Sequence, residues 1–356
     1  MLTKNLIEKK LINSEDKVNG IAVLSARSLG EYLFIVDAVT TIWREKLHAR
    51  KDDTKRFYPG ELAPWFRGVS DSTYRLQPTL IRFVAEEVFT STKLREKHRH
   101  DYDKEFDDLR SILKVEEYLL QRFKSFGSPL FGNRLPENEI GWNFVLRHHR
   151  APSRLLDWSK GSLVALHFAI GKKYNRMSDV KEAAVWILEP RRLAELTTKT
   201  RRILGVNKDS DKEHISMFHG GPKEKDPEKK YINEAGEEVP MTKHMNNYYP
   251  LPIIPNLFSP RIATHIGRFT LHTIEQAKKP DGGFEDFAMT AANKDEGMCY
   301  LVKVVIPMEQ REQREEMVRM LRMTGIADIN FSQDLDDLAD ELRLRVKLGT
   351  NAQPDI

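Results

Sequence analysis

Apolar side chains recur every three or four residues in several parts of the chain, the period of an α-helix that buries one face. Four segments share this pattern: residues 25–48, 101–126, 309–324 and 334–346. Ser28 stands near the start of the first segment, where a hydroxyl can accept hydrogen bonds from the free amides of a helix. Gly325 follows the third segment, in the position where a glycine commonly ends a helix. The pattern therefore predicts four amphipathic helices.

Other apolar runs lack this amphipathic period and predict strands or a fully buried helix. Residues 183–190 and 298–307 are rich in apolar and β-branched side chains, which favour strands. Residues 261–274 are strand-like, and residues 63–83 predict a strand, a Ser/Asp turn and a short helix. Residues 162–170 are apolar with alanines at close-packing positions, so we expect a buried helix there. Together these elements predict an α+β fold with a small mixed or antiparallel sheet surrounded by helices.

The chain divides into a main domain and two flanking segments. We expect residues 1–50 to form an N-terminal helical segment packed on the core, residues 51–346 to form the main domain and residues 347–356 to form a tail. Within the main domain, residues 206–250 are rich in Gly, Lys, Asp, Glu and Pro and show no sustained period. This composition predicts a flexible insertion at the surface.

Composition narrows the class of protein without giving a function. The 356 residues are 40% hydrophobic, which is enough to build a core, and the net charge of +4 argues neither for nor against a nucleic-acid partner. The single cysteine, Cys299, excludes an internal disulfide framework and fits a reducing compartment. The apolar runs are well short of the roughly 20 residues that cross a bilayer. We therefore expect a cytoplasmic protein with no membrane partner, and the sequence leaves its oligomeric state open.

Three segments place charged or polar side chains beside apolar ones: residues 65–68, 148–159 and 261–270. Arg67 lies in the predicted strand of the first segment, and a buried arginine needs an anionic partner. Asp157 can supply that partner in a structural ion pair, and a bound phosphate can supply it equally well. Gly68 favours a binding site, because a glycine lets a ligand approach the backbone closely.

The second segment allows a structural and a functional interpretation. Ser159 stands where the N-cap of the helix at residues 162–170 is expected, so its hydroxyl can satisfy the first amides of that helix. In the functional interpretation, the helix N-terminus attracts a phosphate and Trp158 stacks on a ring, which together suit a nucleotide. Arg154 and Asp157 add charged groups just before this helix start.

The histidines and the remaining motifs indicate neither a metal site nor a phosphate loop. His148 and His149 are adjacent, so in a strand their side chains point to opposite faces, and no further ligand follows at metal-binding spacing. We therefore predict no metal, with His148 in the core or in contact with substrate. His265 and Arg268 favour structural pairing by default. The chain lacks glycine-rich phosphate loops and a Gly-x-Ser-x-Gly motif, and Cys299 lies in a strand pattern typical of an inert buried thiol.

The first two segments resemble the FRG domain, a family named after the tripeptide Phe66-Arg67-Gly68. The tripeptide is followed by residues 74–82 (YRLQPTLIR) as in the family, and residues 148–159 resemble its Pro-Thr-Arg-Leu-Leu-Asp-Trp-Thr segment. The resemblance spans about residues 25–346. It identifies the main domain, residues 51–346, as an FRG domain that carries the flexible insertion.

Two positions depart from the family pattern. Arg150 stands where the family has a glycine, and His265 stands where it has a glutamine. The first departure predicts backbone strain, because an arginine tolerates a positive φ poorly and a glycine does not. The second departure weakens any catalytic role for the third segment.

A weaker resemblance points to arginine-serine-glutamate ADP-ribosyltransferases. An arginine-glycine pair ends a first strand, a hydroxyl and a Val-Ala-Leu-x-Phe-Ala helix follow at residues 159–169, and a strand with a polar residue comes later. The resemblance implies an ADP-ribosyltransferase-like core in which Arg67 holds NAD as a substrate, Ser159 organises the site and His265 lies at the third catalytic position. Histidine is not permanently anionic, so the stabilising group for a cationic transition state has no clear occupant.

These observations lead to three functional hypotheses. The main one is an NAD-consuming ADP-ribosyltransferase, a toxin or phage-defence effector that modifies a protein or a nucleic acid. The alternatives are a non-catalytic module that binds a nucleotide or nucleic acid, and a scaffold whose charged residues pair internally. The candidate catalytic residues are Arg67, Ser159 and His265. The candidate substrate- or cofactor-binding residues are Gly68, Arg82, His148, Arg154, Asp157 and Trp158.

Overall fold

A mixed sheet forms the centre of the computed structural model, which describes residues 3–12, 17–18, 20–49, 63–83, 109–130, 139–171, 181–193, 230–232, 238–240, 250–253, 267–272 and 298–326. Within these residues the sheet has eight strands, in the order β1-β2-β10-β5-β3-β4-β9-β8. Their bounds are β1 (Lys17–Val18), β2 (Ile21–Ser25), β3 (Trp65–Val69), β4 (Leu155–Ser159), β5 (Glu182–Leu188), β8 (Leu251–Ile253), β9 (Gly267–Leu271) and β10 (Leu301–Pro307). β10 pairs with β2 in parallel, and the other neighbours are antiparallel. The predicted mixed sheet is confirmed, and it is wider than the small sheet we expected.

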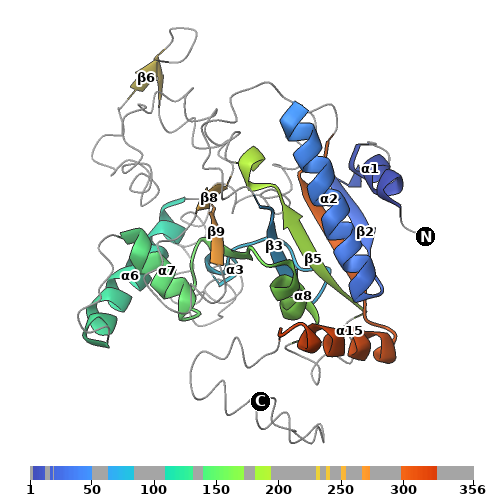
Figure 1. Ribbon diagram of the computed structural model, residues 1–356. Helices are drawn as coiled ribbons and strands as arrows, with labels where there is room; N and C mark the ends of the chain where they lie inside the picture. Colours follow the sequence, from blue (N-terminus) through green and yellow to red (C-terminus); the bar gives the residue numbers. More distant parts are fainter. Residues whose placement is uncertain are drawn as a thin grey trace, which may run out of the picture.

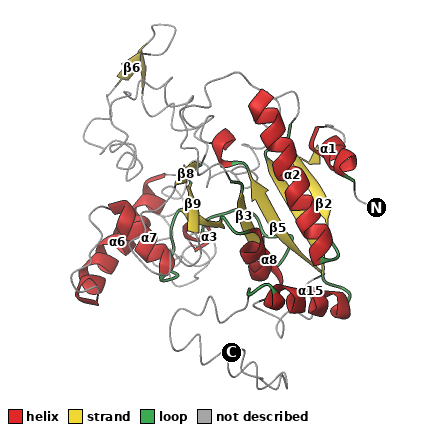
Figure 2. Cartoon of the chain, in the orientation of Figure 1, coloured by secondary structure: helices red, strands yellow, loops and turns green. Residues whose placement is uncertain are grey.

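Helices pack against two parts of this sheet. Their bounds are α1 (Lys4–Ile12), α2 (Leu29–Ala49), α3 (Thr79–Phe83), α6 (Leu109–Gly127), α7 (Glu139–His148), α8 (Ser162–Ile170) and α15 (Arg311–Met323), with a short 3-10 helix at Ser128–Leu130. Figure 1 shows α2 in front of the sheet near β2 and β5, α8 by the lower ends of β3 and β5, and α15 below them, whereas α6 and α7 lie beside β8 and β9. Figure 2 shows the same division between helices and strands. The helices predicted at residues 162–170 and 309–324 are confirmed as α8 and α15.

Local sequence signals set the ends of two helices. The Ser28 hydroxyl accepts a hydrogen bond from the Glu31 amide at 3.2 Å, at the start of α2. The Glu31 carboxylate in turn accepts the Arg27 amide at 2.7 Å. This reciprocal arrangement is close to a capping box. At the end of α15, Gly325 has a φ of +79°, which glycine adopts without strain. The expected roles of Ser28 and Gly325 are therefore confirmed.

The main hydrophobic core lies between the sheet and the helices α1, α2, α8 and α15. A smaller cluster joins α7 to β4, β8 and β9: Phe144, Leu155, Ile253, Phe269 and Leu271. Cys299 is fully buried beside the main core, as expected for an inert thiol. The Trp43 indole donates to the Cys299 carbonyl at 2.7 Å, which ties α2 to the start of β10.

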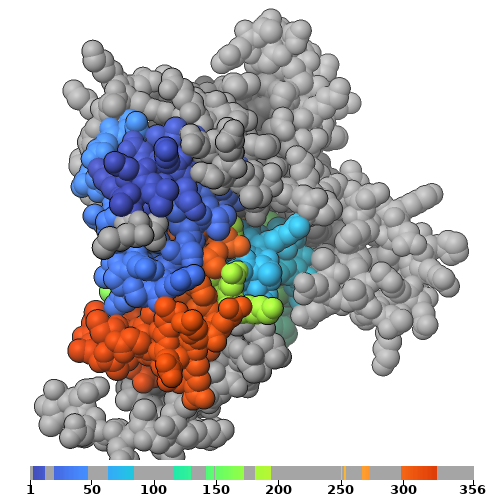
Figure 3. All heavy atoms as spheres, turned by 90° about the vertical axis from the view of Figure 1, so that its right-hand side faces the viewer, coloured from blue at the N-terminus to red at the C-terminus, as the bar shows by residue number. Residues whose placement is uncertain are grey.

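The two ends of the described chain meet in one part of the fold. β2 lies parallel to β10, with Leu24 opposite Val304. Figure 3 shows the blue atoms of the N-terminal segment directly above the orange atoms of residues 298–326. The segment at residues 1–50 therefore supplies two strands, β1 and β2, to the central sheet as well as helices, and the expected helical segment did not include these strands.

Several predicted features lie partly or wholly outside the described residues. Within the predicted insertion, β6 (Lys230–Ile232) and β7 (Glu238–Pro240) form a separate antiparallel pair. The helix predicted at residues 334–346 and the tail at 347–356 lie outside the described ranges. No helix in the described part of the chain is long and apolar enough to cross a membrane.

Candidate functional site

Arg67 occupies the point where regular pairing between two central strands ends. β3 pairs with β5 along its whole length, but with β4 only between Phe66 and Ser159. Beyond that pair, Arg67 Nη1 donates to the main-chain carbonyl of Asp157 at 2.7 Å. The same nitrogen lies 3.8 Å from Asp157 Oδ2. The guanidinium thus supplies a donor where the strand ladder has stopped, and the predicted pairing of Arg67 with Asp157 is confirmed.

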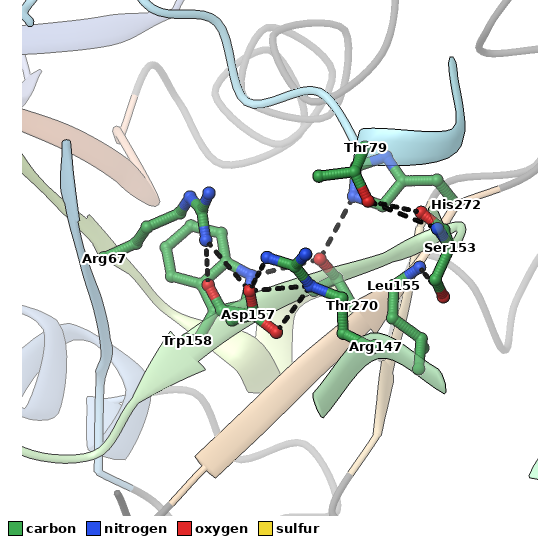
Figure 4. A network of polar contacts seen from close by, with 9 residues as sticks. All are labelled: Arg67, Thr79, Arg147, Ser153, Leu155, Asp157, Trp158, Thr270 and His272. Atoms are coloured by element: carbon green, nitrogen blue, oxygen red, sulfur yellow. Dashed lines mark hydrogen bonds and ion pairs between the residues drawn. The ribbon is translucent and has the colours of Figure 1, made fainter. Parts of the chain in front are cut away.

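Arg147 is a second partner of Asp157 that sequence reasoning missed. It lies on α7, and its Nε donates to both carboxylate oxygens of Asp157, at 3.0 and 2.9 Å. Its Nη2 also contacts Asp157 Oδ2. Figure 4 shows Arg67 and Arg147 pointing toward the same aspartate from different elements. We expected a strand around residues 148 and 149, and that expectation hid the helix that carries Arg147 toward β4.

Arg82 adds a third positive charge near this pair, because α3 is held against the turn before β4. Thr79, the first residue of α3, accepts a hydrogen bond from the Ser153 amide at 3.2 Å. The Leu80 amide donates to the Ser153 carbonyl at 3.1 Å. Arg82 lies in the last turn of this short helix, close enough to repel Arg67 electrostatically. Two anchored contacts therefore hold the helix that carries Arg82 beside the site.

The pKa values of Arg67 and Asp157 are set by burial first and by the neighbouring charges second. Burial lowers the pKa of Arg67 to about 10 despite the attraction of Asp157, and repulsion from Arg147 and Arg82 acts in the same direction as burial. Burial raises the pKa of Asp157, but attraction to Arg147 and Arg67 outweighs it and holds the pKa below its usual value. Among these described groups, two guanidinium groups contact the one carboxylate and a third, Arg82, lies near Arg67. The site is thus suited to an anion.

Arg154, a predicted binding residue, lies in a structural ion pair instead. Its Nε donates to both carboxylate oxygens of Glu116 on α6, at 2.9 and 2.8 Å. Its Nη1 also approaches the His272 carbonyl at 3.4 Å. Both side chains of the ion pair are largely buried. Removing either partner would leave a buried charge uncompensated, so this pair fixes α6 to the start of β4.

A series of hydrogen-bonded side chains next to β4 includes a neutral histidine, His272. The Trp158 indole donates to Thr270 Oγ1 at 3.0 Å, and Thr270 Oγ1 lies 3.1 Å from His272 Nε2 (Figure 4). Burial, together with repulsion from Arg67 and Arg154, lowers the pKa of His272 to about 3. The imidazole is therefore neutral at pH 7 and adds no charge to the site.

Three predicted site residues have structural roles. A Cβ at Gly68 would lie 1.8 Å from the Ala165 carbonyl oxygen, so its close neighbour is α8 and not a ligand. Ser159 ends β4 and is not the N-cap of α8, because Gly161 holds that position and donates its amide to Ser159 Oγ at 3.0 Å. Trp158 is only 3% exposed and uses its indole N–H internally. Its burial in the core corrects the expectation that it stacks on a ligand ring.

The structure does not bring Ser159 and Arg67 together in one site. Ser159 lies opposite Phe66, and directly opposed residues of paired strands share a face. Gly68 faces α8, so its neighbour Arg67 extends from the other face of β3. Ser159 accordingly lies on the α8 side, away from the guanidinium. The arrangement that the ADP-ribosyltransferase resemblance implied for these two residues is not found.

Of the remaining predicted residues, some are described by the structure and others lie outside its described ranges. His148 is the last residue of α7 and does not lie in the strand we expected. His265 and Arg261 lie outside the described residues, while Arg268 is buried in β9 and donates to the Gly267 carbonyl at 3.0 Å. The described residues contain no group of three or more metal-ligating side chains. Arg150 has a φ of 65°, so the strain predicted at this position is confirmed.

The arginine site lies in a part of the chain that is similar to a known family. Residues 63–177 match the family model of the FRG domain. This segment runs from β3 to the end of α8 and contains Arg67, Arg82, Arg147 and Asp157. Searches of curated proteins and of solved structures find no match to this chain. This match supports the predicted FRG resemblance over residues 63–177, about a third of the chain.

Proposed function

We propose that the FRG domain of this chain binds the phosphate groups of a nucleotide, with NAD as the expected ligand. One observation carries the proposal: Arg67 and Arg147 both hold the carboxylate of Asp157, and Arg82 adds a further positive charge near Arg67. A partly buried guanidinium is stable only when its charge is matched, and Asp157 matches one of the three. The planar N–H groups of arginine fit phosphate oxygens in a two-point contact, so a phosphate is the natural counterion.

NAD fits the charge of this site. Its pyrophosphate carries one negative charge on each phosphate, which balances the two positive charges that Asp157 leaves unmatched. Arg67, Arg82 and Arg147 are the residues that would hold this group. ADP-ribose and ATP contain the same linked phosphates, so the proposal also predicts that they bind. Each guanidinium carries five N–H donors and no acceptor, so the three arginines offer donors well beyond those that Asp157 uses.

Transfer of ADP-ribose from NAD remains a further prediction from the weaker resemblance. Such a reaction breaks the bond between the ribose and nicotinamide and forms a bond between the ribose and an acceptor. It requires a group that stabilises the cationic ribose, and among the proposed residues Asp157 is the sole carboxylate and is held by two arginines. The roles as a toxin or phage-defence effector, and the protein or nucleic-acid acceptor, stay predictions with this reaction.

The binding proposal is tested by a thermal-shift screen with NAD, ADP-ribose, ATP and short oligonucleotides. A ligand that binds the folded state must raise the melting temperature. We expect the three mononucleotide or dinucleotide ligands to raise it in the unmodified protein and to raise it less in Arg82→Gln. Arg44→Gln is the charge-matched control, because Arg44 is exposed on α2. No shift with any ligand, or equal shifts in both variants, would overturn the proposal.

The oligonucleotides separate the nucleotide from the nucleic-acid alternative. If they alone raise the melting temperature, the site belongs to a nucleic-acid-binding module, and this stabilisation should weaken steeply with salt. Release of nicotinamide from NAD tests the transferase prediction in the same samples. Release that is lost in Arg67→Lys supports transfer, whereas binding without release leaves a non-catalytic nucleotide module.

A further inference from the structure

A second polar group lies beside Arg67 on the same face of the sheet. β3 and β5 are antiparallel, and Arg67 lies directly opposite Trp186. Opposed side chains of such a pair have Cβ atoms about 5 Å apart and share a face. Since Gly68 faces α8, Arg67 and Trp186 both lie on the face turned away from that helix.

Both residues carry a buried N–H group without an acceptor. Arg67 Nε and Trp186 Nε1 have no hydrogen-bond partner, although Arg67 Nη1 is used by Asp157. The Trp186 side chain is largely enclosed, with the residue 4% exposed. Buried donors in folded proteins are nearly always paired, with protein, water or a ligand. The Trp43 and Trp158 indoles follow that rule, because both donate to acceptors within the fold.

Positive charge continues along the same row of the sheet. β5 pairs with β10, and Trp186 lies opposite Lys303. Lys303 Nζ lies 5.3 Å from the centroid of the Trp186 ring and donates to the Ser72 carbonyl at 2.5 Å. Trp186 thus lies between the Arg67 guanidinium on one neighbouring strand and the Lys303 ammonium on the other. An acceptor that is also an anion matches this pattern better than a neutral carbonyl.

We infer that Trp186 Nε1 and Arg67 Nε together bind an oxygen of a phosphate group, so that the anion site extends from β3 onto β5. This inference rests on the proposed function and adds Trp186 as a binding residue. The ligand it describes is a linked diphosphate. One phosphate is held at the cluster of Arg67, Arg82 and Arg147, and an oxygen of the second is held between Arg67 and Trp186. Lys303 contributes charge from the far side of the indole ring.

The indole N–H signals in nitrogen-15 NMR spectra test the inference directly. Inorganic pyrophosphate and ADP-ribose are titrated separately into the unmodified protein, and Trp186→Phe assigns the Trp186 signal by its loss. If that variant does not fold, phenylalanine variants of the other tryptophans assign the signal by elimination. We expect the Trp186 signal to shift on titration with either ligand, while the Trp43 signal, whose N–H is already bonded, stays in place.

The outcomes separate this inference from the proposed function. If ADP-ribose raises the melting temperature in an Arg82-dependent way but leaves the Trp186 signal unmoved, the arginine site stands and the role of Trp186 is wrong. If neither ligand shifts the signal or the melting temperature, both proposals fail. Where Trp186→Phe folds, we expect it to weaken pyrophosphate binding about tenfold, the effect of one hydrogen bond to a charged group. Unchanged affinity would contradict the inference.

Discussion

At the scale of single residues, Asp157 decides the balance of charge in the site. Its carboxylate receives Arg147 through two nitrogens and lies 3.8 Å from an Arg67 nitrogen. Its main-chain carbonyl receives Arg67 as well. Asp157 therefore fixes the positions of two guanidinium groups. Its carboxylate holds both by charge, and its main-chain carbonyl also accepts a hydrogen bond from Arg67, a contact that a substitution of the side chain does not remove.

Replacing Asp157 with asparagine should give a loss of stability that depends on pH. The pKa of Asp157 is lowered in the folded state, so its stabilising effect is present above the unfolded pKa of about 3.9 and is lost as pH falls through the folded pKa. At pH 7 we expect Asp157→Asn to lower the free energy of unfolding by about 1–2 kcal/mol, since the carboxylate is partly exposed.

Urea unfolding of both proteins from pH 7 to pH 2 measures this effect. The difference between them should shrink toward zero at the acid end, where Asp157 is protonated and resembles asparagine. Other acid-sensitive groups, including His272, are common to both proteins and cancel in the comparison. A difference that stays constant down to pH 2 would show that the ion pairs of Asp157 do not stabilise the fold.

Arg150 should be a position where a single substitution stabilises the protein. Its φ of 65° is unfavourable for a side chain with a Cβ and favourable for glycine. We expect Arg150→Gly to raise the free energy of unfolding by up to about 1 kcal/mol and the melting temperature by about 2 °C. Arg150→Ala keeps the strain and is the control. Equal stabilisation by alanine would mean that the arginine side chain, and not the backbone, is the source.

At the scale of elements, successive residues of β3 point to opposite faces of the sheet and have different roles. Phe66 and Gly68 face α8, and Arg67 extends from the other face toward Asp157. The absence of a side chain at Gly68 lets α8 contact the strand backbone directly. Close packing on one face therefore fixes the strand that presents the guanidinium on the other.

Gly68→Ala should strongly destabilise the protein. The added Cβ would lie 1.8 Å from the Ala165 carbonyl oxygen and 2.7 Å from the Ala169 amide, both in the backbone of α8. Backbone atoms cannot rotate away, so α8 must shift, and we expect a loss of about 3 kcal/mol in urea unfolding. The matched control is Gly30→Ala in α2, whose Cβ meets only Ser28 Oγ at 3.9 Å and should stabilise by about 0.5–1 kcal/mol. A small loss at Gly68 would show that α8 packs loosely.

Elements were predictable from the sequence where a local pattern determines them, and contacts between elements were not. The apolar run at residues 162–170 became α8 with those bounds, and Gly325 ended α15. The same local reasoning placed Ser159 at an N-cap that Gly161 occupies, an error of two residues. Arg147 was missed because its contact with Asp157 depends on how α7 packs against β4. The strain at Arg150 was predicted because the family has a glycine at this position. A glycine in a family pattern often marks a backbone conformation with positive φ, which arginine tolerates poorly.

At the scale of the whole molecule, positive and negative charges nearly balance, but positive side chains gather around Arg67. The net charge is only +4 over 356 residues, yet Arg67 and Arg147 share one aspartate and Arg82 lies near Arg67. They come from β3, α3 and α7, which lie within the segment that matches the FRG domain. The rest of the described fold, including β2 from the N-terminal segment and β10 from the C-terminal part, completes the sheet that supports them.

Calorimetric titration of ADP-ribose into the unmodified protein, Arg82→Gln and Arg44→Gln tests the central claim most directly. Each variant loses one positive charge, but only Arg82 lies near Arg67 in the proposed site. The account predicts binding to the unmodified protein and Arg44→Gln with equal affinity, and about tenfold weaker binding to Arg82→Gln. Absence of binding to the unmodified protein, or equal affinity for all three proteins, would contradict it.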